Sequence, residues 1–422
     1  MSTTAAAPTY KKSGPLLFLA FSSMWTGLVI TEFVSNNVLS WEIKKFTENA
    51  FIISFLLSLN PAFGFIANPI IGIISDRIWT PVGRRAFFLI VGAPIVAICL
   101  ILIPHAQSLF LLISLIFIYQ IVQDILWGSD HPLLADLVKP EMRTKMVGTM
   151  NTCSQIAGFF FLRYAMDGGD NFFGTNLPFY IAAAAQAFMV GAVAVYIGRL
   201  EKPPVKTDRP KLTIKRYFKD AFADPIRGRY LTMVFSASFS LSVIQGLASL
   251  YAVETLLLSR AEFGQAWSYF SLIPIFFAFA AGWAVERFLP KPLALAIGFS
   301  VMAGGSIVGY FSTGQNSLSL AAVVISAGTV VFQVTYKAFY TEFLPRDIIG
   351  QLSGVLNICY ALGRLLAYWI AGGIIYLLGN DYSYIWPISA VASIISIIIV
   401  LGIPDPRYNQ RKKQAAEAAA AN

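Results

Sequence analysis

The sequence is short of the residues on which most enzyme sites and disulfide-stabilised folds depend. Its 422 residues include only two histidines, His105 and His131, and no Cys/His cluster with metal-ligand spacing. The three cysteines, Cys99, Cys153 and Cys359, lie in apolar segments and are predicted to pack as small residues, so no disulfide framework is expected. A Walker loop and a nucleophile elbow are also missing. These absences predict a protein that is not an enzyme and that uses no metal or other cofactor.

Charged residues are scarce as well. They make up 13% of the chain, against 57% hydrophobic residues, whereas a soluble domain carries about 25% charged residues. The net charge of +9 would by itself suit a nucleic-acid partner. However, 25 of the 31 Lys and Arg residues fall in segments predicted to be cytoplasmic, three fall in outer loops and three within apolar spans. This asymmetry predicts that both termini are cytoplasmic. It also accounts for the positive net charge, so no nucleic-acid partner is expected.

Long apolar runs dominate the rest of the chain. Twelve are long enough to cross a bilayer, at roughly 20 residues each. Continuous runs of this kind predict helices, because the strands of a membrane barrel alternate apolar and polar residues. The spans are predicted at approximately 15–40, 49–74, 86–104, 108–131, 146–166, 177–198, 230–256, 265–288, 291–313, 317–341, 349–376 and 382–402. The predicted fold is an all-α membrane protein with twelve transmembrane helices in two pseudo-symmetric six-helix bundles.

One long basic connection divides the chain into six spans plus six. It contains ten Lys or Arg residues. The predicted organisation is a cytoplasmic tail over 1–14, an N-terminal bundle over 15–198, the basic cytoplasmic linker over 199–229, a C-terminal bundle over 230–402 and a cytoplasmic tail over 403–422. The first apolar run is too long for a cleavable signal peptide. We therefore expect a multi-pass protein of a bacterial inner membrane.

The two halves repeat each other. Residues 72–77 (Gly-Ile-Ile-Ser-Asp-Arg) return 210 positions later as residues 282–287 (Gly-Trp-Ala-Val-Glu-Arg), and Asp136 returns 206 positions later as Glu342. Each copy places an acid–Arg pair at the inner end of an apolar segment. Internal duplication in a very apolar chain is typical of secondary transporters.

Two loops resemble those of a known family. Residues 68–85 read Asn-Pro-Ile-Ile-Gly-Ile-Ile-Ser-Asp-Arg-Ile-Trp-Thr-Pro-Val-Gly-Arg-Arg, which resembles the signature loop of the major facilitator superfamily. The long spacing between Asp-Arg and Gly-Arg-Arg is similar to that of the glycoside–pentoside–hexuronide symporters, closest to their sucrose:proton symporter-like branch. Residues 130–143, Asp-His-Pro-Leu-Leu-Ala-Asp-Leu-Val-Lys-Pro-Glu-Met-Arg, fit that branch too. The resemblance covers the twelve-span plan, but only the N-terminal half carries sharp motifs.

The resemblance and the repeated acid–Arg pairs together predict a gate at the inner ends of the helices. Gly72 permits close helix approach, Asp76 can accept backbone N–H groups at a helix start, and the arginines can pair with acids across the domain interface. The alternative is that these arginines only mark the cytoplasmic side. The candidate gating residues are Gly72, Asp76, Arg77, Gly83, Arg84, Arg85, Asp136, Arg143, Glu286, Arg287 and Glu342.

Polar residues at membrane depth predict a substrate site, because charged groups there are costly and usually functional. Arg364 shares a helical face with an amide and two phenols, and Asp124 shares one with an indole. The alternative for Arg364 is a structural ion pair with Asp124 or Glu32. The predicted substrate-binding residues are Trp25, Asp124, Trp127, Asn357, Tyr360, Arg364 and Tyr368.

Three acids are candidate proton carriers: Glu32, Asp124 and Asp130. An acid beside a low-dielectric cavity holds its proton more tightly than one in water. Alternatively, Glu32 reaches the outer water or pairs with a neighbouring helix, and Asp130 caps or pairs near the cytoplasm. Asn68 stands where the melibiose permease relatives place an acid for sodium. The resemblance therefore implies no sodium site, which favours proton coupling or uniport.

These observations predict a secondary active transporter of a di- or oligosaccharide or glycoside, working by proton symport and alternating access. Its expected partners are the sugar, the proton and the lipid bilayer, and a monomer is expected to suffice. One alternative is a carrier of amphiphilic or amino-sugar solutes such as muropeptides or lysolipids, because residues 123–125 (Gln-Asp-Ile) also resemble muropeptide permeases. The other is a non-transporting membrane sensor, although no fused signalling domain is visible.

Overall fold

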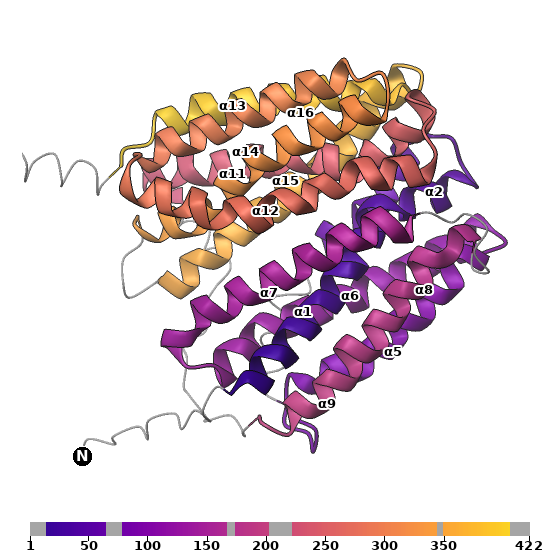
Figure 1. The fold of residues 1–422 in the computed structure, drawn as a ribbon, viewed down its shortest axis with the longest axis vertical. Helices are drawn as coiled ribbons and strands as arrows, with labels where there is room; N and C mark the ends of the chain where they lie inside the picture. Colours follow the sequence, from indigo (N-terminus) through magenta and orange to yellow (C-terminus); the bar gives the residue numbers. More distant parts are fainter. Residues whose placement is uncertain (1–13, 65–77, 167–173, 202–221, 344–348, 406–422) are drawn as a thin grey trace, which may run out of the picture. The chain divides into compact units, whose positions relative to one another are not determined.

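The computed structural model describes residues 14–64, 78–166, 174–201, 222–343 and 349–405 (Figure 1). Ten helices in these ranges are long and apolar enough to cross a membrane. Two of the twelve predicted spans are not among those ten. The span predicted at 49–74 is described as a shorter apolar helical stretch, Ala50–Gly64, since 65–77 lie outside the described residues. The span predicted at 146–166 is helical, but its helix begins earlier, at Pro140, and carries more polar residues.

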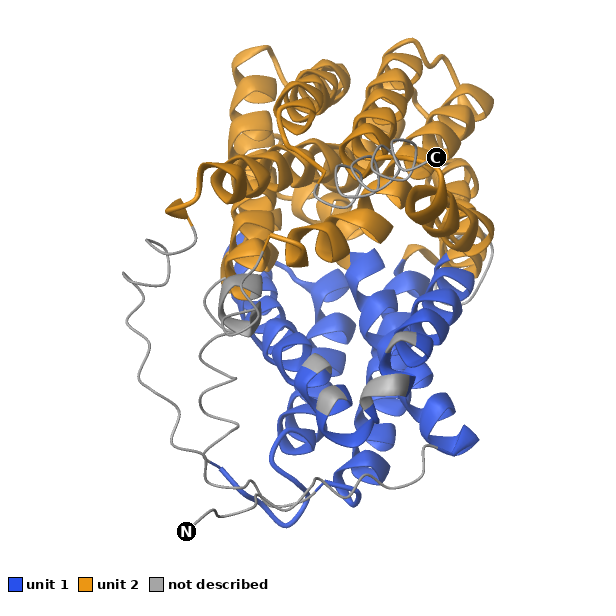
Figure 2. Cartoon of the chain, turned by 90° about the vertical axis from the view of Figure 1, so that its left-hand side faces the viewer, with its two compact units in different colours: residues 1–34, 66–158, 176–207 blue, residues 35–65, 159–175, 208–422 orange. Residues whose placement is uncertain are grey.

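The chain forms two compact units (Figure 2). Unit 1 comprises residues 1–34, 66–158 and 176–207, and unit 2 comprises 35–65, 159–175 and 208–422. Two segments of the first half therefore belong to unit 2. The predicted domain boundaries follow chain order instead, and they stay a prediction.

Unit 1 is built from helices of the first half of the chain. They are α1 (Pro15–Asn37, of which 15–34 belong here), α5 (Ala86–Leu102), η1 (Ile103–His105), α6 (Leu109–Leu137), α7 (Pro140–Phe160, to residue 158), α8 (Leu177–Ala184), η4 (Ala185–Ala192) and α9 (Val193–Gly198). The short helix η3 (Gly174–Asn176) lies at the boundary, with residues 174 and 175 in unit 2 and residue 176 in unit 1. Segment η4 is a π-helix that joins α8 to α9 in one continuous span.

Unit 2 contains the helices of the second half and three short ones from the first. They are α2 (Leu39–Lys44), α3 (Ala50–Leu57), η2 (Phe161–Ala165), α11 (Pro225–Leu250), η5 (Tyr251–Thr255), α12 (Arg260–Arg287), α13 (Lys291–Tyr310), α14 (Gln315–Thr341), α15 (Ile349–Leu377), η6 (Tyr382–Tyr384) and α16 (Ile385–Leu401). The short helices attach firmly: Trp41 Nε1 donates to Ser249 O at 3.3 Å, and Trp369 Nε1 donates to Ser58 Oγ at 2.8 Å.

Polar side chains define where several of these apolar helices begin. Ser108 accepts a hydrogen bond from Leu111 N at the start of α6, and Asp224 accepts one from Ile226 N at the start of α11. Helix α12 begins with a capping box between Ser259 and Glu262. Such caps satisfy backbone N–H groups that a helix start leaves without partners.

Serine hydroxyls join the helices in the core of unit 2. Ser240 of α11 lies 2.8 Å from Ser389 Oγ and 2.7 Å from Ser393 Oγ, both on α16, and Ser306 of α13 donates to Ser389 at 3.3 Å. All four are buried. Small polar residues of this kind hold membrane helices together, because lipid offers no alternative partner.

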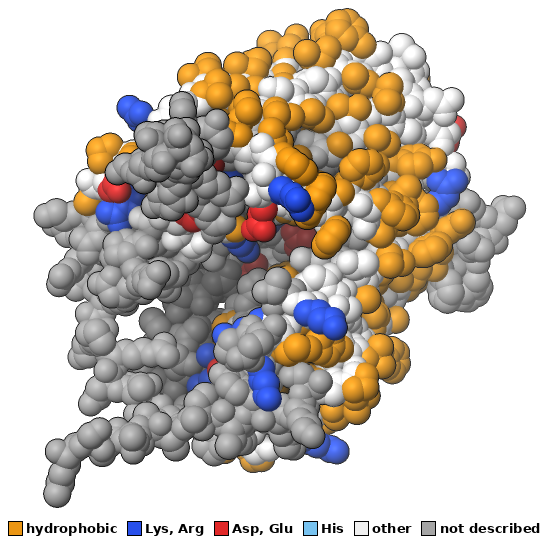
Figure 3. Space-filling model, turned by 60° about the vertical axis from the view of Figure 1, so that its left-hand side comes forward, with side chains coloured by type: hydrophobic (Ala, Val, Ile, Leu, Met, Phe, Trp, Pro, Cys, Tyr) orange, Lys and Arg blue, Asp and Glu red, His pale blue; other side chains and the backbone are white. Residues whose placement is uncertain are grey.

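Large apolar side chains cover much of the outer surface, as Figure 3 shows for one face. Phe110 is 81% exposed, Phe188 72% and Phe279 85%. A soluble protein does not expose such side chains in this number, whereas a bilayer solvates them. The surface therefore agrees with the membrane environment predicted from composition.

Candidate functional site

Unit 1 brings three predicted binding residues together. The rings of Trp25 on α1 and Trp127 on α6 meet edge to face, with centroids 4.9 Å apart and an angle of 88°. Asp124 precedes Trp127 by one helical turn and is 6% exposed. We call Trp25, Asp124 and Trp127 the indole–acid cluster.

A buried hydrogen-bond chain lies beside this cluster. Tyr119 OH donates to Thr31 O at 3.1 Å, Thr31 Oγ1 donates to Gln186 Oε1 at 3.0 Å, and Gln186 Nε2 donates to Gln123 Oε1 at 3.3 Å. Gln123 Nε2 has no hydrogen-bond partner among the described residues. The chain links α1, α6 and η4 and fixes the position of the Gln123 amide. Sequence reasoning missed Thr31, Tyr119 and Gln186, although amides in apolar helices were a usable signal.

The predicted binding residues of unit 2 all lie on α15, but their surroundings differ. Tyr360 stacks on Tyr336 of α14, with ring centroids 5.9 Å apart. Tyr368 is 2% exposed and fills the space beside Gly246 of α11, where an added Cβ would come within 2.1 Å of its ring. Arg364 is half-buried, and Asn357 is exposed. Tyr336 is a further aromatic that the sequence analysis did not single out. The expected convergence of this group with the indole–acid cluster stays a prediction.

The three candidate proton carriers differ in exposure. Asp130 is fully buried and Asp124 nearly so, both on α6, whereas Glu32 on α1 is half-buried. Asp130 lies inside α6, seven residues before its end, so it is not a helix cap.

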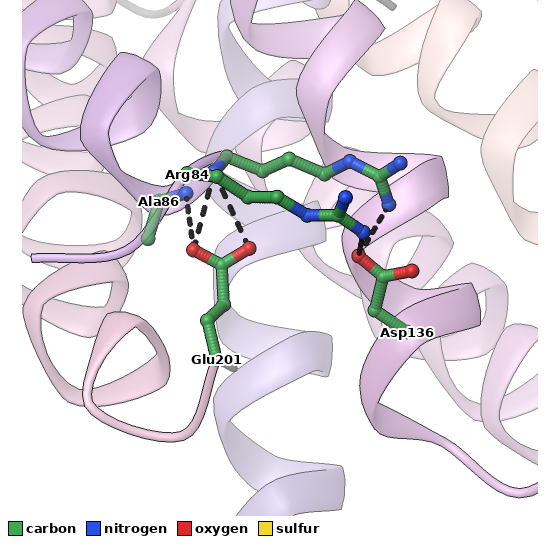
Figure 4. Close-up of polar contacts among 5 residues, drawn as sticks. Arg84, Ala86, Asp136 and Glu201 are labelled. Atoms are coloured by element: carbon green, nitrogen blue, oxygen red, sulfur yellow. Dashed lines mark hydrogen bonds and ion pairs between the residues drawn. The ribbon is translucent and has the colours of Figure 1, made fainter. Parts of the chain in front are cut away.

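The predicted gate is described from Ile78 onward, and its arginines converge on one acid (Figure 4). Arg85 Nη1 lies 2.6 Å from Asp136 Oδ2, and Arg84 Nη2 contacts the same oxygen. Asp136 is near the end of α6 and the arginines precede α5, so the cluster joins two helix ends of unit 1. Gly72, Asp76 and Arg77 lie outside the described residues. Arg143 Nε donates to Val138 O at 3.0 Å, just beyond α6.

Glu201 belongs to the same cluster at the start of α5, and sequence reasoning missed it. Its carboxylate accepts backbone hydrogen bonds from Arg85 N at 3.1 Å and from Ala86 N at 3.2 Å, which cap the start of α5. The helix dipole favours an anion at this position. Burial raises the pKa of Glu201, whereas the backbone N–H donors and Arg84 oppose that rise. Gly83, at φ 104°, leaves room for the carboxylate, because an added Cβ would lie 2.0 Å from Glu201 Oε2.

Unit 2 repeats this arrangement at the start of α13. Lys291 Nζ contacts Glu342 Oε1, and Lys291 N donates to Asp405 Oδ2 at 2.8 Å. Glu342 is the repeat partner of Asp136, and Asp405 occupies the place that Glu201 has in unit 1. The sequence repeat thus extends to two ion clusters of the same design.

The second predicted acid–Arg pair, Glu286 and Arg287, lies exposed at the end of α12. The Arg287 guanidinium stands 5.7 Å from the ring centroid of Trp283 and 5.8 Å from that of Phe288.

The Glu201 cap gives a first prediction. In Glu201→Ala the N–H groups of Arg85 and Ala86 lose their acceptor, so we expect a loss of about 1–3 kcal/mol in the free energy of unfolding. Glu201→Gln retains a neutral acceptor oxygen and should lose clearly less. Thermal unfolding of the detergent-solubilised protein measures both. An unchanged free energy of unfolding in Glu201→Ala would show that the carboxylate does not act as a cap.

A second charged cluster lies in unit 2 around α2, η5 and the start of α12. Glu42 is 1% exposed, 2.5 Å from Lys45 Nζ and 3.9 Å from Arg260 Nη1. The Arg260 guanidinium stands 4.8 Å from the ring centroid of Trp41. Lys44 pairs with Glu254. We call this cluster the charged end of unit 2; it consists of Trp41, Glu42, Lys44, Lys45, Glu254 and Arg260. These contacts tie α2 to segments more than 200 residues later in the chain.

Helices of this length and apolarity, with ion clusters at repeated helix starts, define a multi-pass membrane transporter. The sequence profile of the Major Facilitator Superfamily matches residues 15–368 and, again, 230–421. The chain belongs to this superfamily, which confirms the predicted fold.

Solved transporters of several kinds share this fold. The nucleoside transporter NupG is 14% identical, with a TM-score of 0.69 over 92% of this chain and 98% of that one. A bacterial homolog of the human lysosomal transporter Spinster, inward-facing and unoccupied, is 15% identical, with a TM-score of 0.69 over 93% and 96%. The peptide transporter POT in complex with sulfate is 16% identical, with a TM-score of 0.69 over 92% and 93%.

One curated relative is the human proton myo-inositol cotransporter. It is 22% identical over 139 residues, which cover 33% of this chain and 22% of the cotransporter. This chain therefore matches about a fifth of the length of that relative.

Proposed function

We propose that this transporter carries a di- or oligosaccharide or glycoside together with protons, as in the sucrose:proton symporter-like branch that its loops resemble. The observation that carries the proposal is the indole–acid cluster, together with the buried Gln123 amide on the same helix α6. An indole face packs on the apolar face of a sugar ring. Asp124 can accept hydrogen bonds from hydroxyl groups, and Gln123 Nε2 is a buried donor that has no hydrogen-bond partner among the described residues.

Proton coupling is supported by the acids of α6. Asp124 and Asp130 are both buried in a helix that also carries the binding residue Trp127. Protonation of one of them would therefore change the charge beside the substrate. The human relative is named for a proton and a polyol, which fits this chemistry over the matched third of the chain.

Orientation follows from the basic residues. We infer that both termini and the linker over 199–229 are cytoplasmic, which places the ion clusters at the starts of α5 and α13 inside. The charged end of unit 2 then lies outside.

This orientation predicts a labelling pattern. A cysteine placed at Ser108 should react with an impermeant maleimide added to whole cells, whereas a cysteine at Thr207 should react only after the cells are opened. The three native cysteines are removed first, and a cysteine-free parent is the control. Labelling at 207 but not at 108 in whole cells would reverse the orientation.

The substrate class is tested by a thermal-shift screen of sugars on the purified protein, because a ligand that binds the folded state raises its stability. The sugar with the largest shift is then titrated against Trp127→Ala, in which we expect the shift to disappear. Trp283→Ala, which removes a lipid-exposed indole of α12, is the matched control and should keep it. If sugars are inert and lysolipids or muropeptides give the shift, the sugar proposal is wrong.

A further inference from the structure

A cavity of about 470 Å³ lies at the charged end of unit 2. Three segments line it: Lys44 at the end of α2 with Glu48 after it, Glu254 at the end of η5, and Asp381 and Tyr382 at the start of η6. A volume of this size suits a small organic molecule. The cavity belongs to unit 2 alone and does not include the indole–acid cluster of unit 1.

The lining is strongly acidic. Three carboxylates, those of Glu48, Glu254 and Asp381, face one cation, Lys44, which pairs with Glu254. Among the described residues Glu48 and Asp381 have no ion-pair partner. Two negative charges of the lining are therefore not neutralised, and a ligand that carries positive charge would be attracted here.

A buried phenol of the lining independently points to a ligand. Tyr382 is 2% exposed, and its hydroxyl has no hydrogen-bond partner within the part of the chain that the structure describes. Buried hydroxyls in native proteins nearly always have a partner. Tyr382 lines the same cavity as Glu48, Glu254 and Asp381.

We propose that this cavity binds a small organic cation that carries a primary ammonium group and hydroxyls, such as an amino sugar. The ammonium would donate to Glu48 and Asp381, and a ligand hydroxyl would bond to Tyr382. An inorganic metal ion fits less well, because the described acids, cysteines and histidines form no group of three that could hold one. The ammonium would also compete with Lys44 for Glu254, which would loosen the tie between α2 and η5.

The experiment is calorimetric titration of D-glucosamine into the full-length protein in detergent. The neutral N-acetyl-D-glucosamine is the ligand control. We expect glucosamine to bind, its Kd to rise with ionic strength, and the acetylated sugar to bind at least tenfold more weakly. Glu48→Gln and Asp381→Asn should each raise the Kd about tenfold, since each removes one charged acceptor. The asparagine retains the oxygen that accepts from Ser383 N, so η6 keeps its cap.

Two further variants decide where the ligand binds. Glu262→Gln removes an acid at the start of α12 that does not line the cavity, and the glutamine can keep the capping box of that helix. The Kd of glucosamine for this variant should therefore equal that for the wild type. Tyr382→Phe should raise the Kd several-fold. Absence of glucosamine binding, or equal Kd values in all these variants, would overturn the proposal. Displacement by Ca²⁺ or Mg²⁺ at concentrations below the Kd for glucosamine would instead identify an inorganic cation site.

The proposed function, which rests on the indole–acid cluster of unit 1, is tested separately from the cavity proposal. If glucosamine binding is lost in Asp124→Asn and kept in Glu48→Gln, the amine binds at the indole–acid cluster. The cavity proposal is then wrong, while the proposed transport function stands. If neutral sugars give no shift in the thermal-shift screen and glucosamine binding is still weakened in Glu48→Gln, the proposed transport function is wrong. The cavity proposal then stands.

Discussion

Asp124→Asn should abolish proton-driven sugar accumulation. The side chain is nearly buried on α6, three residues before Trp127, and in the proposed mechanism its proton and the substrate therefore share one site. Asparagine keeps the size and the hydrogen-bonding oxygen but cannot release a proton. We expect accumulation in proteoliposomes under an inward proton gradient to fall to the level of empty vesicles, while sugar exchange without a gradient continues.

Matched variants decide whether this effect is specific. Asp130→Asn and Glu32→Gln test the other two candidate carriers, and Glu262→Gln removes an exposed acid that has no part in the proposed site. Suppose that Asp124→Asn still accumulates sugar, while Asp130→Asn or Glu32→Gln loses accumulation and keeps exchange. The proton carrier is then the residue replaced in that variant. If all variants lose exchange as well, the acids serve binding or folding and not coupling.

Lys291→Met should destabilise the protein by about 3–5 kcal/mol, because it leaves the carboxylate of Glu342 buried without its cation. The side chains of the two residues are only 7% and 10% exposed. The double variant Lys291→Met/Glu342→Leu should recover most of the loss, since no uncompensated charge then remains. Chemical unfolding in detergent, monitored by circular dichroism, measures all three proteins.

The Lys44–Glu254 pair is the control for this prediction. Its side chains are 22% and 35% exposed, so water screens the attraction. Lys44→Met should therefore cost no more than about 1 kcal/mol. Losses of similar size in Lys291→Met and Lys44→Met would show that the cluster at the start of α13 does not carry a buried charge.

The sequence predicted the fold because apolar length alone requires spanning helices in a bilayer. It also predicted that Asp136 and Glu342 hold corresponding positions, since equal spacing in a repeat preserves position on the helix, and each forms an ion pair at the start of a repeated helix. The rings of Trp25 and Trp127, two members of the predicted substrate group, are in contact, while their role in substrate binding stays a prediction. In these cases a local pattern was sufficient.

Partners from distant segments could not be predicted in this way. Glu201 caps α5 from beyond the end of α9, and nothing in its neighbourhood indicates which helix start it will meet. The pairing of Lys44 with Glu254 likewise joins residues 210 positions apart. Tyr368 shares a helical face with Arg364, yet its ring packs against Gly246, since the neighbouring helix decides which aromatic is buried. Such contacts depend on tertiary packing.

The central claim, proton-coupled sugar transport, is tested most directly by substrate-driven proton movement. Proteoliposomes are equilibrated at one pH with zero membrane potential, and the sugar selected by thermal shift is added outside. We predict an immediate alkalinisation of the external medium with wild-type protein, none with Asp124→Asn, and no change when sodium replaces potassium. Sugar uptake that proceeds without proton movement, or that requires sodium at fixed pH, would contradict the account.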